Sequence, residues 1–423
     1  MTAELGTLPE QTRQRLEELG TVDLVIGLVE HLGGDKAAAT LAAIRQGLAN
    51  LANSNQASFG RTVVAHNDGG AAGVPDGLED ESLRLLKYSA PVFDPSITLA
   101  QGISNAYRAI WGISGQLNAR VCVVIASALE SVTPEWIHGL VQPILERDFD
   151  LVAPCYAPQK FEGLLNSAIL YPLTRAVYGK QLQNPLGPDF GLSARVIQSL
   201  LQPDTVRARG ASAQQFVLIG PTAVVKGFKV CQAHLGRRIY SPPDWKNLDS
   251  ILASVLGPLF LDMERDAPFW QHIRRSEPVP TYGERLPLTE ETVAVDLRRL
   301  LEPFQLGFRN LQEIWSLVLP PGSLLELRRV HRMAPEEFRF PDELWTRIVY
   351  DFALAYRLRT IARDHLLRAM TPLYLGWVAG YALEVEASDA AAVEKRSERL
   401  CTAFESGKPY LVSRWRWPDR FNP

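Results

Sequence analysis

Residues 119–156 constrain the fold most, because they contain two buried-strand patterns joined by one helix pattern. Residues 122–125 form an apolar run, rich in β-branched side chains, of the kind that a parallel sheet buries on both faces. A threonine N-cap and a first-turn proline begin an amphipathic helix at residue 133, and residues 149–153 return as a strand. Ligands of open α/β sheets bind beyond the carboxyl ends of strands, so we expect residues 126–130 to lie at a ligand site.

The same alternation of strands and helices continues through the first 245 residues. It predicts an α/β fold with a doubly wound, mostly parallel sheet. From residue 246 the pattern changes to amphipathic helices separated by proline-rich joints, which predicts a helical C-terminal domain. An aromatic stripe from Trp345 to Tyr356 is typical of core packing. We therefore expect an N-terminal helix at 1–20, a sheet domain at 21–245 and a helical domain at 246–423.

Composition and charge argue against several classes of partner. The net charge of −3 gives no reason to expect nucleic acid or an anionic membrane surface. No apolar run approaches the roughly 18–20 residues that span a bilayer, and the N-terminus does not have the pattern of a signal peptide. The four cysteines are widely spaced, without metal-ligand spacing, which predicts buried, reduced thiols and a cytoplasmic location.

The segment after the first of these strands resembles a known enzyme family. Residues 129–137 read Leu-Glu-Ser-Val-Thr-Pro-Glu-Trp-Ile. This is similar to the Leu-x-Ser-(Ile/Val)-x-Pro-x-Trp-Ile of GT-A-fold, nucleotide-sugar-dependent glycosyltransferases of the mannosylglycerate and glucosylglycerate synthase-like group. The resemblance spans residues 21 to 415 and includes similar segments at 67–70, 171–180, 185–193, 340–381 and 408–412. It implies a GT-A domain, a helical C-terminal region and a nucleotide-sugar substrate.

The metal ligands of that family are missing. The resemblance implies Asp-x-Asp at the strand end and a later His, which hold Mg²⁺ or Mn²⁺. This chain has Ala126, Ser127 and Ala128 at the first position and Tyr240 near the second. Such cations need hard oxygen donors and offset the charge of the departing diphosphate. We therefore name no metal ligand and no catalytic residue, expect no cofactor, and expect metal-dependent transfer to be lost.

The nucleotide side of the site is partly retained. Asn67, Asp68 and Gly69 match the family's second nucleotide-contacting loop, in which an acid accepts from the base or ribose and glycine lets the backbone approach. The same residues also favour a plain turn. Together with Ser127 they are our predicted nucleotide-sugar contacts. Residues 28–31 replace the family's base-binding segment and differ from it in sequence.

The acceptor side is represented by three residues. The resemblance implies that Lys160, Asn166 and Asp189 face the acceptor. Asp189 lies in a loop similar to Gly-Gly-Asp-Phe-Gly in which one glycine has become Pro188, and a proline fixes φ and removes an N–H. Asp189 is therefore either a ligand of a sugar hydroxyl or acceptor, or a structural cap.

The distribution of acids supports the loss of the metal site. No Asp or Glu occurs between Asp94 and Glu130 or between Asp204 and Asp244. The second interval contains six basic residues: Arg207, Arg209, Lys226, Lys229, Arg237 and Arg238. Arginine binds a diphosphate through a bidentate fork. Because the changes touch several parts of the site together, natural drift explains the two alanines better than engineering does.

Three functions remain open. The first is a pseudoenzyme: a glycosyltransferase-like protein with a structural, regulatory or partner-binding role, whose partner is another copy of itself in an oligomer or an active paralogue. The second is a metal-independent glycosyltransferase that moves a sugar from a nucleotide sugar to a small acceptor such as glycerate, using Arg207, Arg209, Arg237 or Arg238. The third is a sensor that binds a nucleotide sugar without transfer. Turnover in EDTA separates the second from the first.

Overall fold

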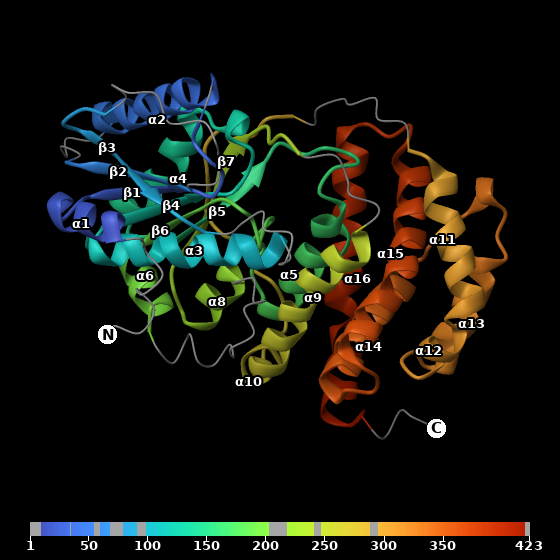
Figure 1. Cartoon of the computed structure of the whole chain (residues 1–423). Coiled ribbons are helices and arrows are strands. Elements are labelled where there is room, and N and C mark those ends of the chain that lie inside the picture. The colour runs from blue at the N-terminus through green and yellow to red at the C-terminus, as the bar shows by residue number, and fades with distance from the viewer. Residues whose placement is uncertain are drawn as a thin grey trace. The chain divides into compact units, whose positions relative to one another are not determined.

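The computed structural model describes residues 10–33, 35–54, 60–67, 79–90, 99–202, 218–240, 247–287 and 295–418 (Figure 1). Contacts group the chain into two compact units. The first contains residues 1–157, 182–241 and 279–286, and the second contains residues 158–181, 242–278 and 287–423. The units are interleaved along the chain, whereas the sequence patterns suggested one boundary near residue 245.

One sheet forms the centre of the first unit. Its described strands are β1 (Leu24–Leu28), β2 (Thr62–Asn67), β3 (Leu83–Tyr88), β4 (Val121–Ile125), β5 (Leu151–Tyr156), β6 (Phe190–Ser193), β7 (Val230–Gly236) and β8 (Thr281–Tyr282). They lie in the order β3-β2-β1-β4-β6-β5-β7-β8. All neighbours are parallel except β6, which is antiparallel to both β4 and β5. The predicted mostly parallel sheet is confirmed.

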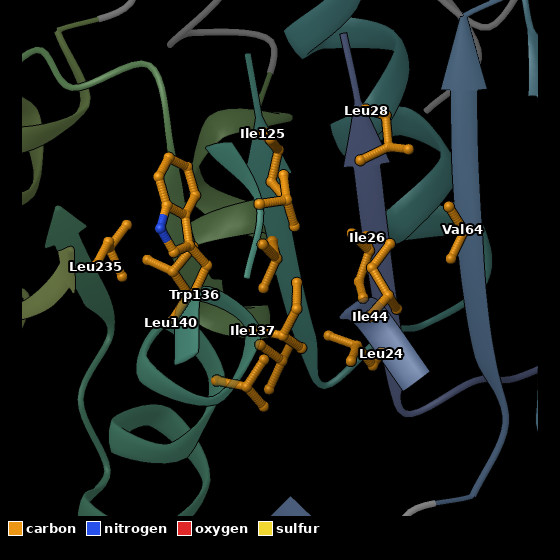
Figure 2. Packing of buried hydrophobic residues seen from close by; sticks show 14 of the residues in the cluster. Leu24, Ile26, Leu28, Ile44, Val64, Ile125, Trp136, Ile137, Leu140 and Leu235 are labelled. Carbon is orange, nitrogen blue, oxygen red and sulfur yellow. The ribbon is translucent and has the colours of Figure 1, made fainter. Parts of the chain in front are cut away.

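Helices cover both faces of this sheet. The described α-helices of the first unit are α1 (Glu10–Leu19), α2 (Asp35–Ser54), α3 (Leu99–Gln116), α4 (Pro134–Arg147), α6 (Ala194–Leu200) and α8 (Ile219–Val225). On one face, Ile44 of α2 and Trp136 and Ile137 of α4 belong to one buried cluster with Ile26 of β1 and Ile125 of β4 (Figure 2). On the other face, a Cβ at Gly27 would lie 2.3 Å from a side-chain carbon of Ile110 in α3. Successive strand residues point to opposite faces, so the sheet is doubly wound, as predicted.

The α4 helix forms where its sequence predicts. Thr133 is extended, and Pro134 is the first helical residue, where its missing N–H costs no hydrogen bond. Trp136, Ile137, Leu140 and Val141 of its apolar face are fully buried. Asp148 ends the helix in the left-handed conformation with φ of 55°.

Three described strands of the sheet were not predicted from the sequence, and one of them, β6, lies in the segment that was expected to be an acceptor-side loop. β3 carries Arg84 and Lys87, and β8 is a two-residue strand inside a segment that reads as a proline-rich joint. Both lie at the edges of the sheet within the described residues. Edge strands are often short and charged, so their apolar pattern is weak.

The second unit is helical. Its described helices are the π-helix η3 (Asn166–Leu170), α5 (Tyr171–Tyr178), α9 (Leu248–Arg265), α10 (Ala267–Trp270), α11 (Leu297–Asn310), α12 (Gln312–Ser316), α13 (Pro321–His331), the 3₁₀-helix η4 (Pro335–Glu337), α14 (Asp342–Leu358), α15 (Arg363–Val385) and α16 (Ala390–Arg416). The stripe from Trp345 to Tyr356 is buried, which confirms its predicted role in packing. The Trp345 indole N–H also donates to the carbonyl of Ala168 at 2.9 Å. Within the described ranges, no helix is both long and apolar enough to cross a membrane.

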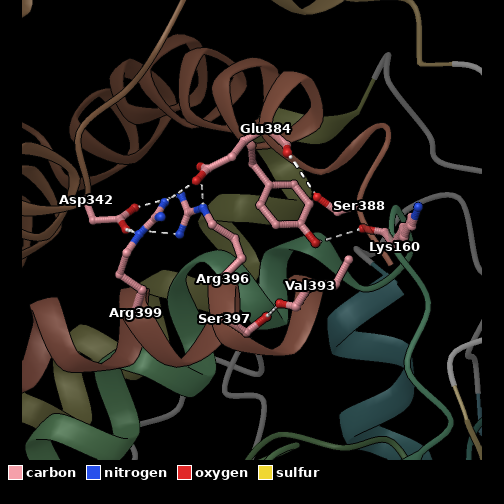
Figure 3. A network of polar contacts seen from close by, with 9 residues as sticks. Lys160, Asp342, Glu384, Ser388, Val393, Arg396, Ser397 and Arg399 are labelled. Carbon is pink, nitrogen blue, oxygen red and sulfur yellow. Dashed lines mark hydrogen bonds and ion pairs between the residues drawn. The ribbon is translucent and has the colours of Figure 1, made fainter. Parts of the chain in front are cut away.

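An ion-pair network with a buried Asp342–Arg396 pair at its centre joins three helices of the second unit (Figure 3). Arg396 of α16 donates to both carboxylate oxygens of Asp342, the first residue of α14, at 2.8 and 3.0 Å. It also donates to Glu384 of α15 at 2.6 Å. Arg399 contacts the same two acids. Two arginines therefore face two carboxylates, and Asp342 also benefits from the positive end of its helix.

The four cysteines are buried, and none of them forms a disulfide. Burial raises the pKa of each thiol to about 12. A thiol with so high a pKa is a poor nucleophile. The predicted burial of the four thiols is confirmed.

Candidate functional site

The carboxyl ends of three neighbouring strands meet at one edge of the sheet. β2, β1 and β4 are adjacent and parallel. β1 and β4 are neighbours in the sheet. From β1 the chain continues to β2, on the side away from β4, whereas from β4 it continues to β5, on the side away from β1. Ligands of open α/β sheets bind at such a switch point. The residues there are Glu30 after β1, Asn67 at the end of β2 and Ala126 after β4.

Asp189 caps the end of β4. Its Oδ1 accepts the backbone N–H groups of Ala126 at 2.9 Å and Ser127 at 3.0 Å. Its Oδ2 accepts the hydroxyls of Ser127 and Tyr156. The Asp189 side chain has no exposed surface. All four donors belong to the chain itself. For Asp189 to contact a sugar-acceptor substrate, as the resemblance implies, that substrate would have to displace one of these hydrogen bonds.

Close backbone packing brings Asp189 to this position. It precedes β6, in which a Cβ at Gly191 would lie 2.1 Å from the carbonyl oxygen of Leu140. Only glycine permits that approach, which lets β6 run between β4 and β5 beneath α4. Pro188 keeps a structural role, because its carbonyl accepts the Tyr107 hydroxyl at 3.0 Å.

Asn67 joins the ends of three strands. Its side-chain amide donates to the carbonyls of Ala90 at 3.0 Å and Val29 at 3.4 Å, and its Oδ1 accepts the Ala90 N–H at 2.9 Å. The residue is buried. These contacts hold the strand ends together, and the predicted contact of Asn67 with a nucleotide stays a prediction. Asp68 and Gly69 lie outside the described residues.

Polar side chains also contact one another between β1 and β4. Glu30 accepts the N–H of Leu129 at 3.4 Å, and burial raises the pKa of the Glu30 carboxyl. Glu130 pairs with Lys36, and this contact lowers the pKa of the Glu130 carboxyl. Sequence reasoning did not select Glu30 or Lys36 as functional, because neither belongs to a motif. The sequence feature that could have identified Glu30 is its position just after a buried strand, where ligands of α/β sheets bind.

Tyr240, near the position of the family's metal-binding His, lies beside a cation. The Arg238 guanidinium is 4.5 Å from the centre of the Tyr240 ring and 5.3 Å from that of Tyr156. The N–H of Ile239 donates to the Ser131 hydroxyl at 3.0 Å. The segment after β7 is therefore bonded to the turn after β4. The structure thus brings Tyr240 to the same edge as the two alanines.

Lys160 and Asn166 belong to the second unit. The Lys160 ammonium donates to the carbonyl of Glu386 at 3.4 Å, and the Lys160 carbonyl accepts the Tyr381 hydroxyl at 3.1 Å. Asn166 is the first residue of the π-helix η3. Single turns of π-helix are frequent at functional sites. The predicted acceptor contacts of these two residues stay predictions.

The described residues at this edge do not suit a divalent metal ion. The side chains of Ala126 and Ala128 have no atom that can bind a metal ion. Both oxygens of Asp189 accept hydrogen bonds from the chain, and Glu130 is paired with Lys36. Mg²⁺ and Mn²⁺ bind through oxygen donors, chiefly carboxylates. In the part of the chain that the structure describes, no three His, Cys, Asp or Glu side chains are grouped as metal ligands would be.

Comparison with known proteins gives matches among solved structures. No family model matches the chain, and no curated protein does. Glucosyl-3-phosphoglycerate synthase from Mycobacterium tuberculosis is 15% identical in two crystal structures. The complex with Mn²⁺, UDP-glucose and phosphoglyceric acid covers 61% of this chain and 85% of the other (TM-score 0.31). The complex with phosphoglyceric acid covers 66% and 93% (TM-score 0.34). Mannosyl-3-phosphoglycerate synthase from Rubrobacter xylanophilus is 15% identical and covers 62% and 80% (TM-score 0.37).

Proposed function

We propose that this chain is a glycosyltransferase-like protein that has lost metal-dependent sugar transfer and has a structural, regulatory or partner-binding role. The capping of β4 by Asp189 carries this proposal. In the GT-A enzymes that the sequence resembles, the strand end presents carboxylates to a cation. Here two alanines stand at that point, and the backbone N–H groups of Ala126 and Ser127 are bound by a carboxylate from the chain itself.

The chemistry of sugar transfer supports the proposal. A departing nucleoside diphosphate develops negative charge, and a divalent cation that offsets this charge contributes several kcal/mol to the transition state. Each change of about 1.4 kcal/mol alters the rate tenfold. The methyl groups of Ala126 and Ala128 hold no cation, so we expect no metal-dependent turnover.

The proposed partners are a second copy of this chain or an active paralogue, and the proposed location is the cytoplasm. The buried thiols suit a reducing compartment. Analytical ultracentrifugation of the purified chain tests the first partner. A monomer throughout the micromolar range would exclude stable self-association and leave the paralogue.

A metal-independent glycosyltransferase is the second candidate, and the position of Arg238 favours it. Of the arginines considered from the sequence, Arg207 and Arg209 lie outside the described residues, Arg237 is exposed, and Arg238 is half-buried at the strand edge. A fixed guanidinium compensates part of the charge of a diphosphate. A sensor that binds a nucleotide sugar without transfer uses the same contact and differs only in forming no product.

Titration calorimetry with a panel of nucleotide sugars and nucleoside diphosphates tests the proposal, in Mn²⁺ and in EDTA. We expect no binding that depends on the metal. Micromolar binding that requires Mn²⁺ would refute the loss of the metal site. Binding that persists in EDTA favours the second candidate or the sensor, and an assay of sugar transfer in EDTA separates these two.

The double variant Ala126→Asp/Ala128→Asp extends this test. We expect it to gain no Mn²⁺-dependent binding, because Asp189 still holds the strand-end N–H groups and the Arg238 cation repels a metal ion. A gain of such binding would show that the loss is confined to the two side chains.

A further inference from the structure

Helices α11 and α13 of the second unit expose apolar and basic side chains together. Leu306 of α11 is 54% exposed, and Leu325 of α13 is 51% exposed. Each leucine has exposed arginines three to seven positions after it, and residues at such spacings share one helix face. We call these side chains the leucine–arginine surface, and its members are Leu306, Arg309, Leu325, Arg328, Arg329 and Arg332.

The exposed faces of the two helices adjoin. The Gln305 amide of α11 donates to the carbonyl of His331, the last residue of α13, at 3.1 Å. The His331 ring stacks on Phe308 of α11, with 4.1 Å between the ring centres. Arg309 and Arg332 directly follow these contact residues, and both act on His331, because burial and these two charges lower the pKa of its imidazole. The basic side chains of both helices therefore surround one seam.

Acids do not balance this positive charge. In the part of the chain that the structure describes, none of the four arginines forms an ion pair, and Glu326 of α13 pairs instead with Arg347 of α14 at 2.6 Å. Residues 297–333 contain six arginines and three glutamates, of which Glu326 is one. The net charge of −3 averages over the whole chain and therefore does not describe this surface.

The stability of α13 explains only part of this pattern. Basic residues in the last turn favour the negative end of a helix. However, Arg328 and Arg332 are four positions apart, a spacing at which like charges repel. The helix dipole also gives no reason for exposed leucines on the same face. Both features together indicate a surface that a partner covers.

We propose that the leucine–arginine surface binds an anionic lipid membrane, with its arginines at the headgroups and its leucines in the interface. A helix face that combines apolar and basic side chains is typical of helices that lie at a membrane surface. An anionic leaflet supplies many mobile negative groups and so neutralises all four arginines at once. A folded protein would need an acid matched to each of them. The long apolar stems of the arginines let the leucines approach the lipid.

Sedimentation of the full chain with lipid vesicles tests this. The vesicles are made of phosphatidylcholine alone or of equal parts phosphatidylcholine and phosphatidylglycerol. We expect binding to the second kind only, and weaker binding in high salt. A basic residue near an anionic leaflet changes the binding constant roughly fivefold, so we expect Arg328→Gln/Arg332→Gln to weaken binding at least tenfold. Leu325→Gln removes an apolar contact, and we expect it to weaken binding roughly threefold or more.

Arg274→Gln/Arg275→Gln is the matched control. These two arginines are exposed, belong to the second unit and follow α10, outside the leucine–arginine surface. The control undergoes the same change of charge, and we expect its affinity for the anionic vesicles to stay within twofold of the wild type. Circular dichroism checks that the variants fold. If Arg328→Gln/Arg332→Gln does not fold, Arg309→Gln decides, and a loss below twofold counts against the inference.

Four results would overturn the inference. The wild type could bind no anionic vesicle, which would leave an acidic protein as the partner to seek, or it could bind both kinds of vesicle equally. The control could weaken binding as much as the variant of α13 does, or Leu325→Gln could leave the affinity unchanged. None of these assays contains a nucleotide or a metal ion, so the inference and the proposed function fail independently.

Discussion

Replacing Asp189 by leucine tests the cap of β4 directly. The carboxylate accepts two backbone N–H groups on one oxygen and two hydroxyls on the other. A leucine has a similar shape but no acceptor atom, so the two buried backbone N–H groups lose their hydrogen-bond partner. Hydrogen bonds to a charged group contribute about 1.5–3 kcal/mol each, and two lost bonds therefore cost about 3–6 kcal/mol. Burying a neutral group is cheaper than burying a charge, so we expect a net loss of about 3 kcal/mol.

Hydrogen exchange read by mass spectrometry gives the local measurement. The amides of Ala126 and Ser127 donate to Asp189, so a loss of about 3 kcal/mol raises their exchange rates roughly 100-fold when exchange follows local opening. Urea unfolding of the same variant gives the global loss. Asp148→Asn is the control for the loss of a carboxylate, because this side chain is 63% exposed and its ion pairs contribute about 0–1 kcal/mol.

The reasoning fails if the two amides of Asp189→Leu exchange within threefold of the wild-type rate and the stability changes by less than about 1 kcal/mol. A different outcome would reassign the residue. If protection and stability are kept while binding of a ligand is lost, Asp189 is the acceptor contact that the resemblance implies and not a cap.

Three further perturbations test other parts of the molecule. Arg396→Met leaves the buried Asp342 carboxylate without its bidentate partner, so we expect urea unfolding to show a loss of about 3–5 kcal/mol in the free energy of unfolding. Arg399→Met is the control, because the Arg399 side chain is 56% exposed, and an equal loss in both variants would contradict the expectation. Gly191→Ala brings a Cβ within 2.1 Å of the Leu140 carbonyl oxygen, so we expect the free energy of unfolding to fall by about 2 kcal/mol or more. An unchanged denaturation midpoint would show that β6 can shift. Burial lowers the pKa of Lys408 from 10.5 to about 8 in the folded chain. The unfolded chain therefore binds more protons between these values, and the contribution of this group to stability rises with pH. The stability difference between wild type and Lys408→Met should change by about 1 kcal/mol per pH unit in that window, and a constant difference would count against it.

The helices and strands that were predicted correctly are those whose buried residues follow a regular apolar pattern over adjacent positions in the sequence. The β4–α4–β5 unit is one example, because the apolar period of α4 and the run before it depend on adjacent residues only. The buried stripe of α14 is another. The edge strands β3 and β8 escaped prediction, because an edge strand needs few apolar residues and its pairing depends on a partner strand.

The candidate site divides in the same way. The sequence by itself determined that the end of β4 lacks carboxylates, because this requires only the identities of Ala126 and Ala128 and their place after a buried strand. It also raised Asp189 as either a ligand or a cap, without a means to choose. Only the tertiary structure decided what faces the alanines. Asp189 is 63 positions from Ala126 and reaches it because β6 inserts antiparallel between β4 and β5. Arg238 reaches the same edge from the end of β7. Strand order depends on the packing of the whole sheet, which no local period of apolar residues encodes.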